Sequence, residues 1–395
     1  MPMKRLKYIV LSLCCLTVMI CSCIEEFNAQ LPEGDSNLLV VDGNIISDSI
    51  CVFTLTRSFS LNEEGIPEDY NQINADVCVK GSDGSVYTGT PMGNGKYGVK
   101  IGTLNPQQTY HVEIVWEGST YTSIPQQPLA TEGLSLKFTQ PDGNGPVHIL
   151  LSTESPANNE AAYYTWNYIE DWEVRTNFRT NAEFNPKDSS IIEYDYFPYA
   201  KGWVHRLSKD ILINTTANYN NNQLKDKTLY SIGNQDLRIS HLYSTFVVQR
   251  KMTKGEYEYY ECKKRFTNDM GGLFTPQPSE LPTNLRCNDN RKRVIGYVGV
   301  NMNVSIQQLY IPTTEVNYVQ AFRCEETEEK ELLGKLSQLG IKNTTDLYNY
   351  GYRVSYYLYL GPMSPPMITW AEYRCVDCRA LGADPNARPD FWPDF

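Results

Sequence analysis

Short runs in which every second residue is apolar follow one another between residues 37 and 128. They lie at 37–46, 51–59, 75–80, 85–90, 97–101, 110–116 and 120–124. Cys51, Phe53 and Leu55 alternate with more polar neighbours, which is the period of a strand with one buried face. Asp83-Gly84 separates two such runs and favours a hairpin turn. The pattern predicts an N-terminal β-sandwich over 37–128, immunoglobulin-like or transthyretin-like.

The remaining residues, 129–395, predict a larger β-rich C-terminal domain with helices near 253–268 and 325–339. Further strands are expected at 134–139, 148–153, 163–176, 237–250, 294–302, 305–311 and 353–360. Thr253 and Glu256 have the spacing of a capping box, and Gly340 favours the end of the second helix. The polar segment 178–235 reads as long loops with a short helix at 208–213, or as an extended insertion. The fold class is therefore mainly β.

The first 22 residues have the features of a secretory signal. Lys4, Arg5 and Lys7 precede an apolar stretch that is short for a membrane span. Ile20-Cys21-Ser22-Cys23 is similar to a bacterial lipobox, in which the last cysteine is acylated. We expect a lipoprotein signal peptide at 1–22, lipidation of Cys23 and an acidic tether at 23–36. The alternative is an ordinary cleaved signal that leaves a cysteine behind.

Charge excludes one class of partner. The chain has 46 acidic and 35 basic residues, and removal of residues 1–22 moves the net charge from −11 to −14. The longest basic run, at 291–293, is too small for a nucleic-acid footprint, so we expect no nucleic-acid partner. Anchoring would then depend on the acyl chains. Glu25 and Glu26, behind Cys23, resemble the surface-export signal of Bacteroidota lipoproteins, or form a solvated acidic tether.

The order of several short segments resembles Bacteroidota outer-membrane lipoproteins of the domain of unknown function 4249 family. These segments lie at 38–43, 53–58, 163–166, 243–244, 271–278 (Gly-Gly-Leu-Phe-Thr-Pro-Gln-Pro), 282–284, 295–297, 375–378 and 389–392. The resemblance implies an accessory role beside a TonB-dependent outer-membrane transporter. It supplies no catalytic residues.

Signals for catalysis are weak. The four histidines, His111, His148, His205 and His241, show no metal-ligand spacing, and no Gly-x-Ser-x-Gly motif is present. We therefore expect no cofactor and no metal. A carboxylate pair for glycoside cleavage stays open, because such pairs are defined by distance in space.

Cys375-x-x-Cys378 lies in an irregular tail and lacks the setting of a redox dithiol or a second pair for zinc. We expect it to fix the tail to the body through a disulfide. The preferred pair is Cys287–Cys378, with Cys324 as the second candidate partner. Cys51 and Cys78 fall on opposite strand faces, which disfavours a bridge between them.

Aromatic residues supply the candidate binding site. Tyr164, Trp166, Tyr168 and Trp172 share one strand face, where core packing is favoured over ligand contact. Tyr194, Tyr196, Phe197, Tyr199 and Trp203 crowd a polar segment instead. Such rings stack on sugars or line peptide clefts, so these five are the candidate ligand-binding residues.

The leading hypothesis is a non-catalytic outer-membrane lipoprotein facing the cell exterior. It would bind a small ligand, glycan or peptide, or act as an accessory component of TonB-dependent nutrient uptake. Two alternatives stay open. One is an envelope hydrolase acting on peptide or polysaccharide, and the other is a structural or adhesive lipoprotein.

Overall fold

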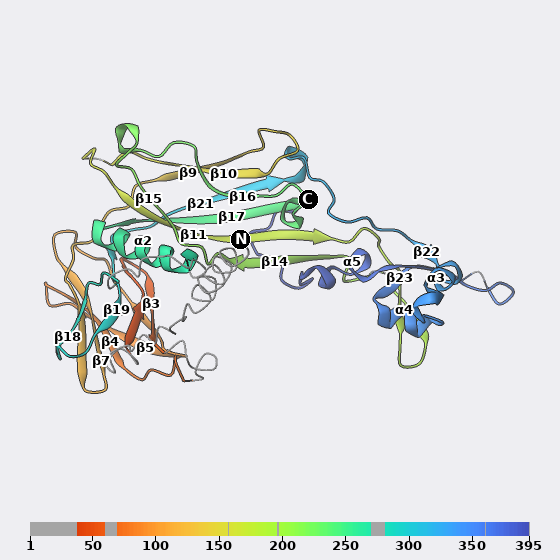
Figure 1. The fold of residues 1–395 in the computed structure, drawn as a ribbon, viewed down its shortest axis with the longest axis horizontal. Coiled ribbons are helices and arrows are strands. Elements are labelled where there is room, and N and C mark those ends of the chain that lie inside the picture. Colours follow the sequence, from red (N-terminus) through yellow and green to blue (C-terminus); the bar gives the residue numbers. More distant parts are fainter. Residues whose placement is uncertain are drawn as a thin grey trace, which may run out of the picture.

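A computed structural model describes residues 38–59, 69–156, 158–195, 197–269, 281–359 and 361–394. The residues expected to form the signal peptide and the tether lie outside these ranges, as do Cys23, Tyr196 and the segment 271–278. The described chain is mainly β, with several sheets and few helices, as expected (Figure 1). None of its helices has the length and apolarity needed to cross a membrane.

The N-terminal sheet surrounds a single core. Its first strands are β1 (Leu39–Asp42), β3 (Ile50–Arg57), β4 (Asp76–Gly81), β5 (Val86–Gly93), β6 (Lys96–Lys100), β7 (Tyr110–Trp116) and β8 (Ser119–Ser123). The first half of β5 pairs with β4 and the second half with β6, so β5 links the two parts of the sheet. Phe53, Val79 and Ile114 from different strands share one buried cluster. The predicted alternation holds, with Phe53 and Leu55 inside and Cys78 half-buried.

Two strands from far along the chain complete this sheet, and a third forms a separate two-stranded sheet with an N-terminal strand. β18 (Leu285–Cys287) pairs with β8, and β19 (Val294–Gly296) pairs in parallel with β1. β20 (Val300–Asn301) pairs with β2 (Ile45–Ile46). The residues of these three strands were expected in the C-terminal domain, which was predicted to begin at residue 129. They pair with N-terminal strands instead. Alternation along a strand shows that one face is buried but does not show which strand is its neighbour.

Two packed sheets form the centre of the molecule. The larger, which we call the central sheet, has the order β14 (Lys201–Leu207), β11 (Tyr163–Arg175), β17 (Leu242–Met252) and β21 (Ser305–Pro312). The smaller has the order β16 (Lys227–Ile232), β10 (Val147–Thr153) and β9 (Leu134–Thr139). Ile149 and Leu151 of the smaller sheet pack against Tyr243 and Val247 of the larger. The two sheets thus bury one face of each other.

The helix expected at 253–268 is confirmed as α2 (Lys254–Asp269). The Glu256 amide donates to Thr253 Oγ1 at 3.2 Å, which caps the first turn. The Glu256 carboxylate in turn accepts from Arg250 Nη2 at 2.5 Å, and both side chains are buried. This pair fixes the start of α2 to the end of β17.

The segment 178–235 differs from its prediction. The short helix expected at 208–213 is wrong, because β15 (Leu212–Thr215) pairs with the start of β11. The same segment supplies β14, β16, η1 (Asn220–Asn222) and a hairpin of β12 (Ala182–Asn185) with β13 (Ser190–Glu193). Its polar composition gave no alternating apolar pattern, although β14 and β16 are the outer strands of their sheets.

A small distal lobe lies at the end of the molecule opposite the N-terminal sheet (Figure 1). It contains β22 (Thr327–Glu328), α3 (Glu329–Leu336), η4 (Ser337–Leu339), α4 (Thr344–Tyr350), β23 (Tyr352–Leu358) and β24 (Met367–Glu372). Trp370 is fully buried and packs with Phe184 of β12. The helix expected at 325–339 is shorter than predicted, since its first residues form β22. Gly340, with φ of 83°, ends the helical segment.

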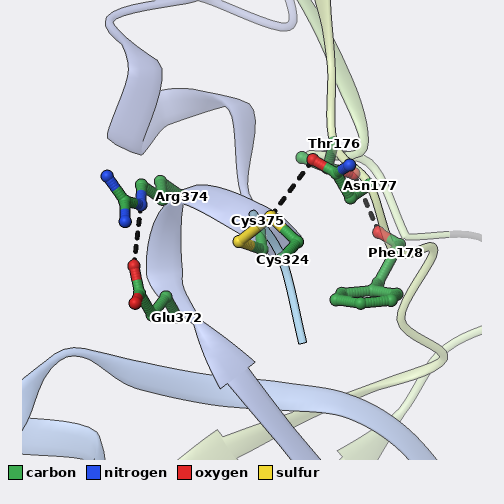
Figure 2. The surroundings of a disulfide bond; sticks show 7 residues. All are labelled: Thr176, Asn177, Phe178, Cys324, Glu372, Arg374 and Cys375. Atoms are coloured by element: carbon green, nitrogen blue, oxygen red, sulfur yellow. Dashed lines mark hydrogen bonds and ion pairs between the residues drawn. A yellow bond between two sulfur atoms is a disulfide. The ribbon is translucent and has the colours of Figure 1, made fainter. Parts of the chain in front are cut away.

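A disulfide joins Cys324 to Cys375, across 51 residues of sequence (Figure 2). The preferred Cys287–Cys378 pair is wrong, because both cysteines are free. Cys375 is in α5 (Tyr373–Val376), where it packs with Phe322 and Phe178. Cys378 begins η5 (Cys378–Leu381) and points into the core of the central sheets. The two cysteines of the motif thus pack in different cores, and only Cys375 forms a disulfide.

Two more single turns connect these parts. η2 (Leu237–Ile239) precedes β17 and η3 (Thr313–Glu315) follows β21. The tail from residue 382 onward then returns to the central sheet, where Trp203 and Asp384 form a backbone bridge. This return matters for the site described next.

Candidate functional site

The aromatic residues predicted to bind ligand separate into two places. Tyr194, Phe197 and Tyr199 pack edge to face, with centroids 5.8 Å and 5.2 Å apart. The guanidinium of Arg379 lies 3.4 Å from the centroid of Tyr199, and it is paired with Asp377. The neighbouring cavity, lined in part by Phe197 and Arg379, measures about 50 Å³, which holds only a few waters. This cluster therefore joins the distal lobe to the body and leaves little room for a ligand.

Trp203 lies apart from that cluster, on β14. It is buried in a cluster with Leu242 and Trp392. The strand residues Tyr164, Trp166, Tyr168 and Trp172 are all buried too, which confirms the core packing favoured from the sequence. Of the predicted ligand-binding residues described here, only Trp203 borders a surface with other binding features.

That surface is the side of the central sheet turned away from the smaller sheet, which we call the open face. Strand register places two rows of four residues across it. One row is His205, Asp171, Ser244 and Tyr310, and the next is Leu207, Ile169, Phe246 and Gln308. Directly opposed residues of antiparallel strands point to the same side, so both rows share this face.

The chain tail covers part of the open face and leaves Leu207 and Ile306 exposed. The ring of Phe391 lies 4.8 Å from that of Phe246, and Tyr310 Oη donates to the Phe391 carbonyl at 3.2 Å. Leu207 is 60% exposed and Ile306, on the adjoining row, is 59% exposed. These two residues lie on the outer strands β14 and β21, and the half-buried Ile169 and Phe246 lie between them; we call these four residues the apolar strip. Exposed apolar groups that gather on one sheet face are typical of contact surfaces.

An Asp–His pair lies beside this apolar strip. His205 Nδ1 is 2.8 Å from Asp171 Oδ1. Asp171 is buried, whereas the His205 side chain is 62% exposed. A carboxylate bonded to Nδ1 fixes the ring and leaves Nε2 free to accept a proton or a hydrogen bond.

Two buried polar atoms on this face lack partners within the described residues. They are Asp171 Oδ2, an acceptor, and Trp203 Nε1, a donor. The residues lie on neighbouring rows, because Asp171 opposes His205 and Glu173 opposes Trp203. Unpaired buried polar atoms are uncommon in native proteins, so such a donor and acceptor indicate a place for an incoming polar group.

Glu173 lies on the open face where the chain tail packs against it. Burial opposes its ionisation, but hydrogen bonds from Arg175, Lys201 and Trp392 outweigh this and lower its pKa below the ordinary value. Trp392 Nε1 donates to Glu173 Oε2 at 3.1 Å. The carboxylate thus holds the tail in place as an anion.

The buried Glu170 points to the opposite side of the sheet and has a different role. It accepts from Arg238 Nη1 and from Tyr243 Oη, each at 2.7 Å, and also pairs with Arg206. Both of its oxygens are engaged inside the sandwich. We interpret Glu170 as a structural residue.

The parts of a hydrolytic triad occur on this protein but not together. Ser231 Oγ is 2.7 Å from His148 Nδ1, on an exposed strand face. His205 has its carboxylate, but the Ser244 hydroxyl one strand further accepts from Gln308 Nε2 at 3.0 Å. Across the described ranges, no histidine has both a hydroxyl and a carboxylate as hydrogen-bond partners. The same ranges contain no cluster of three or more His, Cys, Asp or Glu residues fit to hold a metal ion.

A family model described as "Domain of unknown function (DUF4249)" matches residues 24–307, which is more than half of the chain. The chain belongs to the DUF4249 family. The DUF4249 match includes the N-terminal sheet and the open-face residues of β11, β14 and β17, but it ends before Gln308 and Tyr310 of β21. It ends before the distal lobe and before the tail that carries Phe391 and Trp392. The resembling segments at 375–378 and 389–392 therefore lie outside the matched region.

Similarity to other proteins adds little to the DUF4249 assignment. No curated protein matches the chain. Among solved structures, a DUF4785 family protein from Legionella pneumophila is similar over 53% of this chain and 52% of that one, with 11% identity and a TM-score of 0.17. The chain thus spans about half the length of that structure, and a similarity this low supports no argument about function.

Sequence reasoning missed Asp171 and His205. A signal was present, because Glu170, Asp171 and Glu173 place three carboxylates within a strand otherwise rich in aromatic residues. Carboxylates are rarely buried without a partner or a task. Their assignment to opposite sides of the sheet needed the register.

Proposed function

We propose that this protein is a lipid-anchored lipoprotein of the outer membrane that faces the cell exterior and binds a ligand on its open face. It would do so as a non-catalytic component of TonB-dependent nutrient uptake. Cys23 and the acidic residues behind it support the placement. The observation that supports binding is the exposed apolar strip beside Asp171, whose Oδ2 is buried and unpaired within the described residues.

The open face favours a ligand with two chemical parts. A ring face or aliphatic group would lie against Phe246, Leu207 and Phe391. A hydroxyl or N–H group would donate to Asp171 Oδ2, and an acceptor would take the Trp203 N–H. Sugars and aromatic peptides both provide this combination.

Binding can be measured with the purified protein on glycan and peptide arrays, followed by titration of each positive compound. We expect Asp171→Asn and Phe391→Ala to weaken binding by about tenfold each, the range expected for one hydrogen bond to a charged group or one buried ring. Leu339→Ala is the matched control, because Leu339 is an exposed apolar residue of the distal lobe. Equal binding by all three variants would place the ligand elsewhere.

Placement is tested separately by fractionating cells that express Cys23→Ala. We expect the wild-type protein to sediment with outer membranes, to be cleaved by protease on intact cells and to co-purify with a TonB-dependent barrel. The variant should lose membrane association. A variant that still sediments with outer membranes contradicts the anchoring proposal, and a pure protein that binds no ligand and no barrel contradicts the uptake role.

The hydrolase alternative gains only partial support. Asp171 and His205 provide an oriented base, but within the described residues no serine or cysteine hydrogen-bonds to His205. The structural or adhesive alternative is favoured by the burial of Phe197 and Trp203. It does not account for the exposed strip on the open face, which is why we favour binding.

A further inference from the structure

A solvent-open cavity of about 470 Å³ lies on the distal lobe, where α4 ends and where β24 leads into α5. Its volume falls within the range of about 300–1,000 Å³ that small-molecule sites occupy. Tyr350, Tyr352 and Tyr373 line it together with Glu372 and Arg374. The lobe lies beyond residue 307, where the family match ends, and none of these residues is on the open face. The cavity is therefore a separate site.

Two tyrosine rings form the aromatic side of this cavity. The planes of Tyr350 and Tyr352 are within 10° of parallel, and their centroids are 6.3 Å apart. Tyr350 is 56% exposed, so its ring adds little to the core of the lobe. Exposed aromatic rings of this kind offer an apolar face to the C–H groups of a sugar ring.

The backbone that carries these two rings is held from behind. Gly351 lies between them with φ of 108°, the left-handed conformation that ends α4. Its carbonyl accepts from the Tyr373 amide at 2.8 Å. Arg353 Nη1 donates to the carbonyls of Tyr348 and Tyr352, at 2.7 Å each. A surface fixed in this way before binding loses little freedom when a ligand arrives.

An ion pair forms the polar side of the cavity. Glu372 of β24 lies opposite Tyr352 of β23, so the two side chains point to the same face of the sheet. Arg374 Nε lies 2.7 Å from Glu372 Oε2, and Figure 2 shows this pair turned away from the disulfide. The Arg374 guanidinium also lies 4.5 Å from the centroid of the Phe322 ring, which helps to orient it.

This ion pair has hydrogen-bonding capacity left for a ligand. Within the described ranges, Glu372 Oε1 and the two Nη groups of Arg374 have no hydrogen-bond partner. A carboxylate oxygen beside guanidinium N–H groups can accept from one hydroxyl and donate to the next, which suits the adjacent hydroxyls of a sugar. The pair has no net charge, which favours a neutral ligand over an anionic one.

We propose that this cavity binds a neutral saccharide. One sugar ring would lie against Tyr350 and Tyr352, and two neighbouring hydroxyls would reach Glu372 and Arg374. The distal lobe would thus add a carbohydrate site to a chain whose other binding surface is on the central sheet.

Tyr350 provides a local probe of this site. The experiment measures the rate at which N-acetylimidazole acetylates Tyr350 in the full chain, by peptide mass spectrometry with fragmentation to locate the modified ring. Rates are compared with and without neutral hexasaccharides of glucose, mannose, galactose and xylose. Tyr356 is the internal control, because it is 39% exposed, lies on β23 and is outside the lining. We expect at least one hexasaccharide to slow acetylation of Tyr350 severalfold and to leave Tyr356 unchanged.

A matched pair of variants tests the polar side. Glu372→Gln should weaken binding of the protecting hexasaccharide by about tenfold in a calorimetric titration, since it removes the charged acceptor. Glu325→Gln is the control, because Glu325 also pairs with an arginine two residues away, Arg323, and lies outside the lining. It should bind as wild type does. An unchanged rate at Tyr356 without ligand shows that each variant keeps its fold.

The remaining outcomes separate this site from the open face. Asp171→Asn should leave the protection of Tyr350 intact, whatever it does to binding on the central sheet. The proposal is overturned if no hexasaccharide protects Tyr350, or if the two glutamate variants weaken binding equally. Protection by an aromatic peptide such as Trp-Gly-Trp, without protection by any hexasaccharide, would assign the cavity to peptides and would also overturn it.

Discussion

His205 Nδ1 lies 2.8 Å from one carboxylate oxygen of Asp171, while the other oxygen is buried and has no partner in the described part of the chain. An unsatisfied buried acceptor costs about 1–3 kcal/mol. Among the described residues Glu256 Oε2 is also buried and unpaired, but Glu256 lies inside the buried pair with Arg250, whereas Asp171 lies beside the exposed His205. The arrangement therefore favours a residue that is completed by something from outside.

Asp171→Asn should separate stability from binding. The amide keeps an acceptor for His205 and removes the buried charge, so the free energy of unfolding should stay within about 1 kcal/mol of wild type or rise. Ligand affinity should fall by about tenfold. Urea denaturation measures the first quantity and titration the second, with Asp195→Asn as the control on an exposed carboxylate. A loss of stability without a loss of affinity would make Asp171 a structural residue.

Acid stability should depend on Glu173. Its pKa is lower in the folded protein than in the unfolded chain, so the folded state binds fewer protons there. Its contribution to stability is complete above the ordinary pKa of about 4.3 and is lost as pH falls through the folded value. Urea denaturation between pH 7 and acid conditions should show a weaker dependence in Glu173→Gln than in wild type. Glu193→Gln, on an exposed strand, should match wild type, and an unchanged dependence in Glu173→Gln would contradict the assignment.

The Arg250–Glu256 pair should be costly to break at one end. Glu256→Ala leaves a buried guanidinium unpaired and should lower the free energy of unfolding by about 3–5 kcal/mol. Arg250→Met with Glu256→Leu removes both charges and should recover much of that loss. Guanidinium denaturation of the single and double variants measures the difference, and equal losses would show that the pair's charges do not matter.

The Cys324–Cys375 disulfide should stabilise the attachment of the distal lobe. Cys324→Ser should lower the free energy of unfolding by about 2–4 kcal/mol and speed proteolysis of residues 325–372. Cys287→Ser, at a free half-buried thiol, should have little effect. A reducing agent should bring wild type to the level of Cys324→Ser. If reduction changes nothing, the disulfide is dispensable for the lobe.

Local patterns in the sequence predicted most helices and strands, but they did not predict which distant residues pair with one another. Phe53 and Leu55 alternate with polar residues, so their strand and its buried face followed directly from the period of two. Thr253 and Glu256 located α2 because capping depends only on neighbours in the chain. Cys324 and Cys375 become neighbours only after the lobe folds, and spacing therefore did not single out their bond.

The candidate site shows the same limit. Trp203 was predicted because an aromatic residue in a polar segment is visible in the sequence. Asp171 and His205 are 34 residues apart and meet only through the register of β11 with β14. Tyr194, Phe197 and Tyr199 looked like a binding cluster, but Arg379, 180 residues beyond Tyr199, covers the ring of Tyr199.

The parallel pairing of β1 with β19 sets an order of events during synthesis. Leu39 meets Val294 as its neighbour, so about three-quarters of the chain must leave the ribosome before the first strand has both of its partners. Contacts at such sequence separation are slow to form and leave an unpaired edge in the meantime. The earliest segment to emerge is thus among the last to be finished, and a truncated chain would keep that edge open.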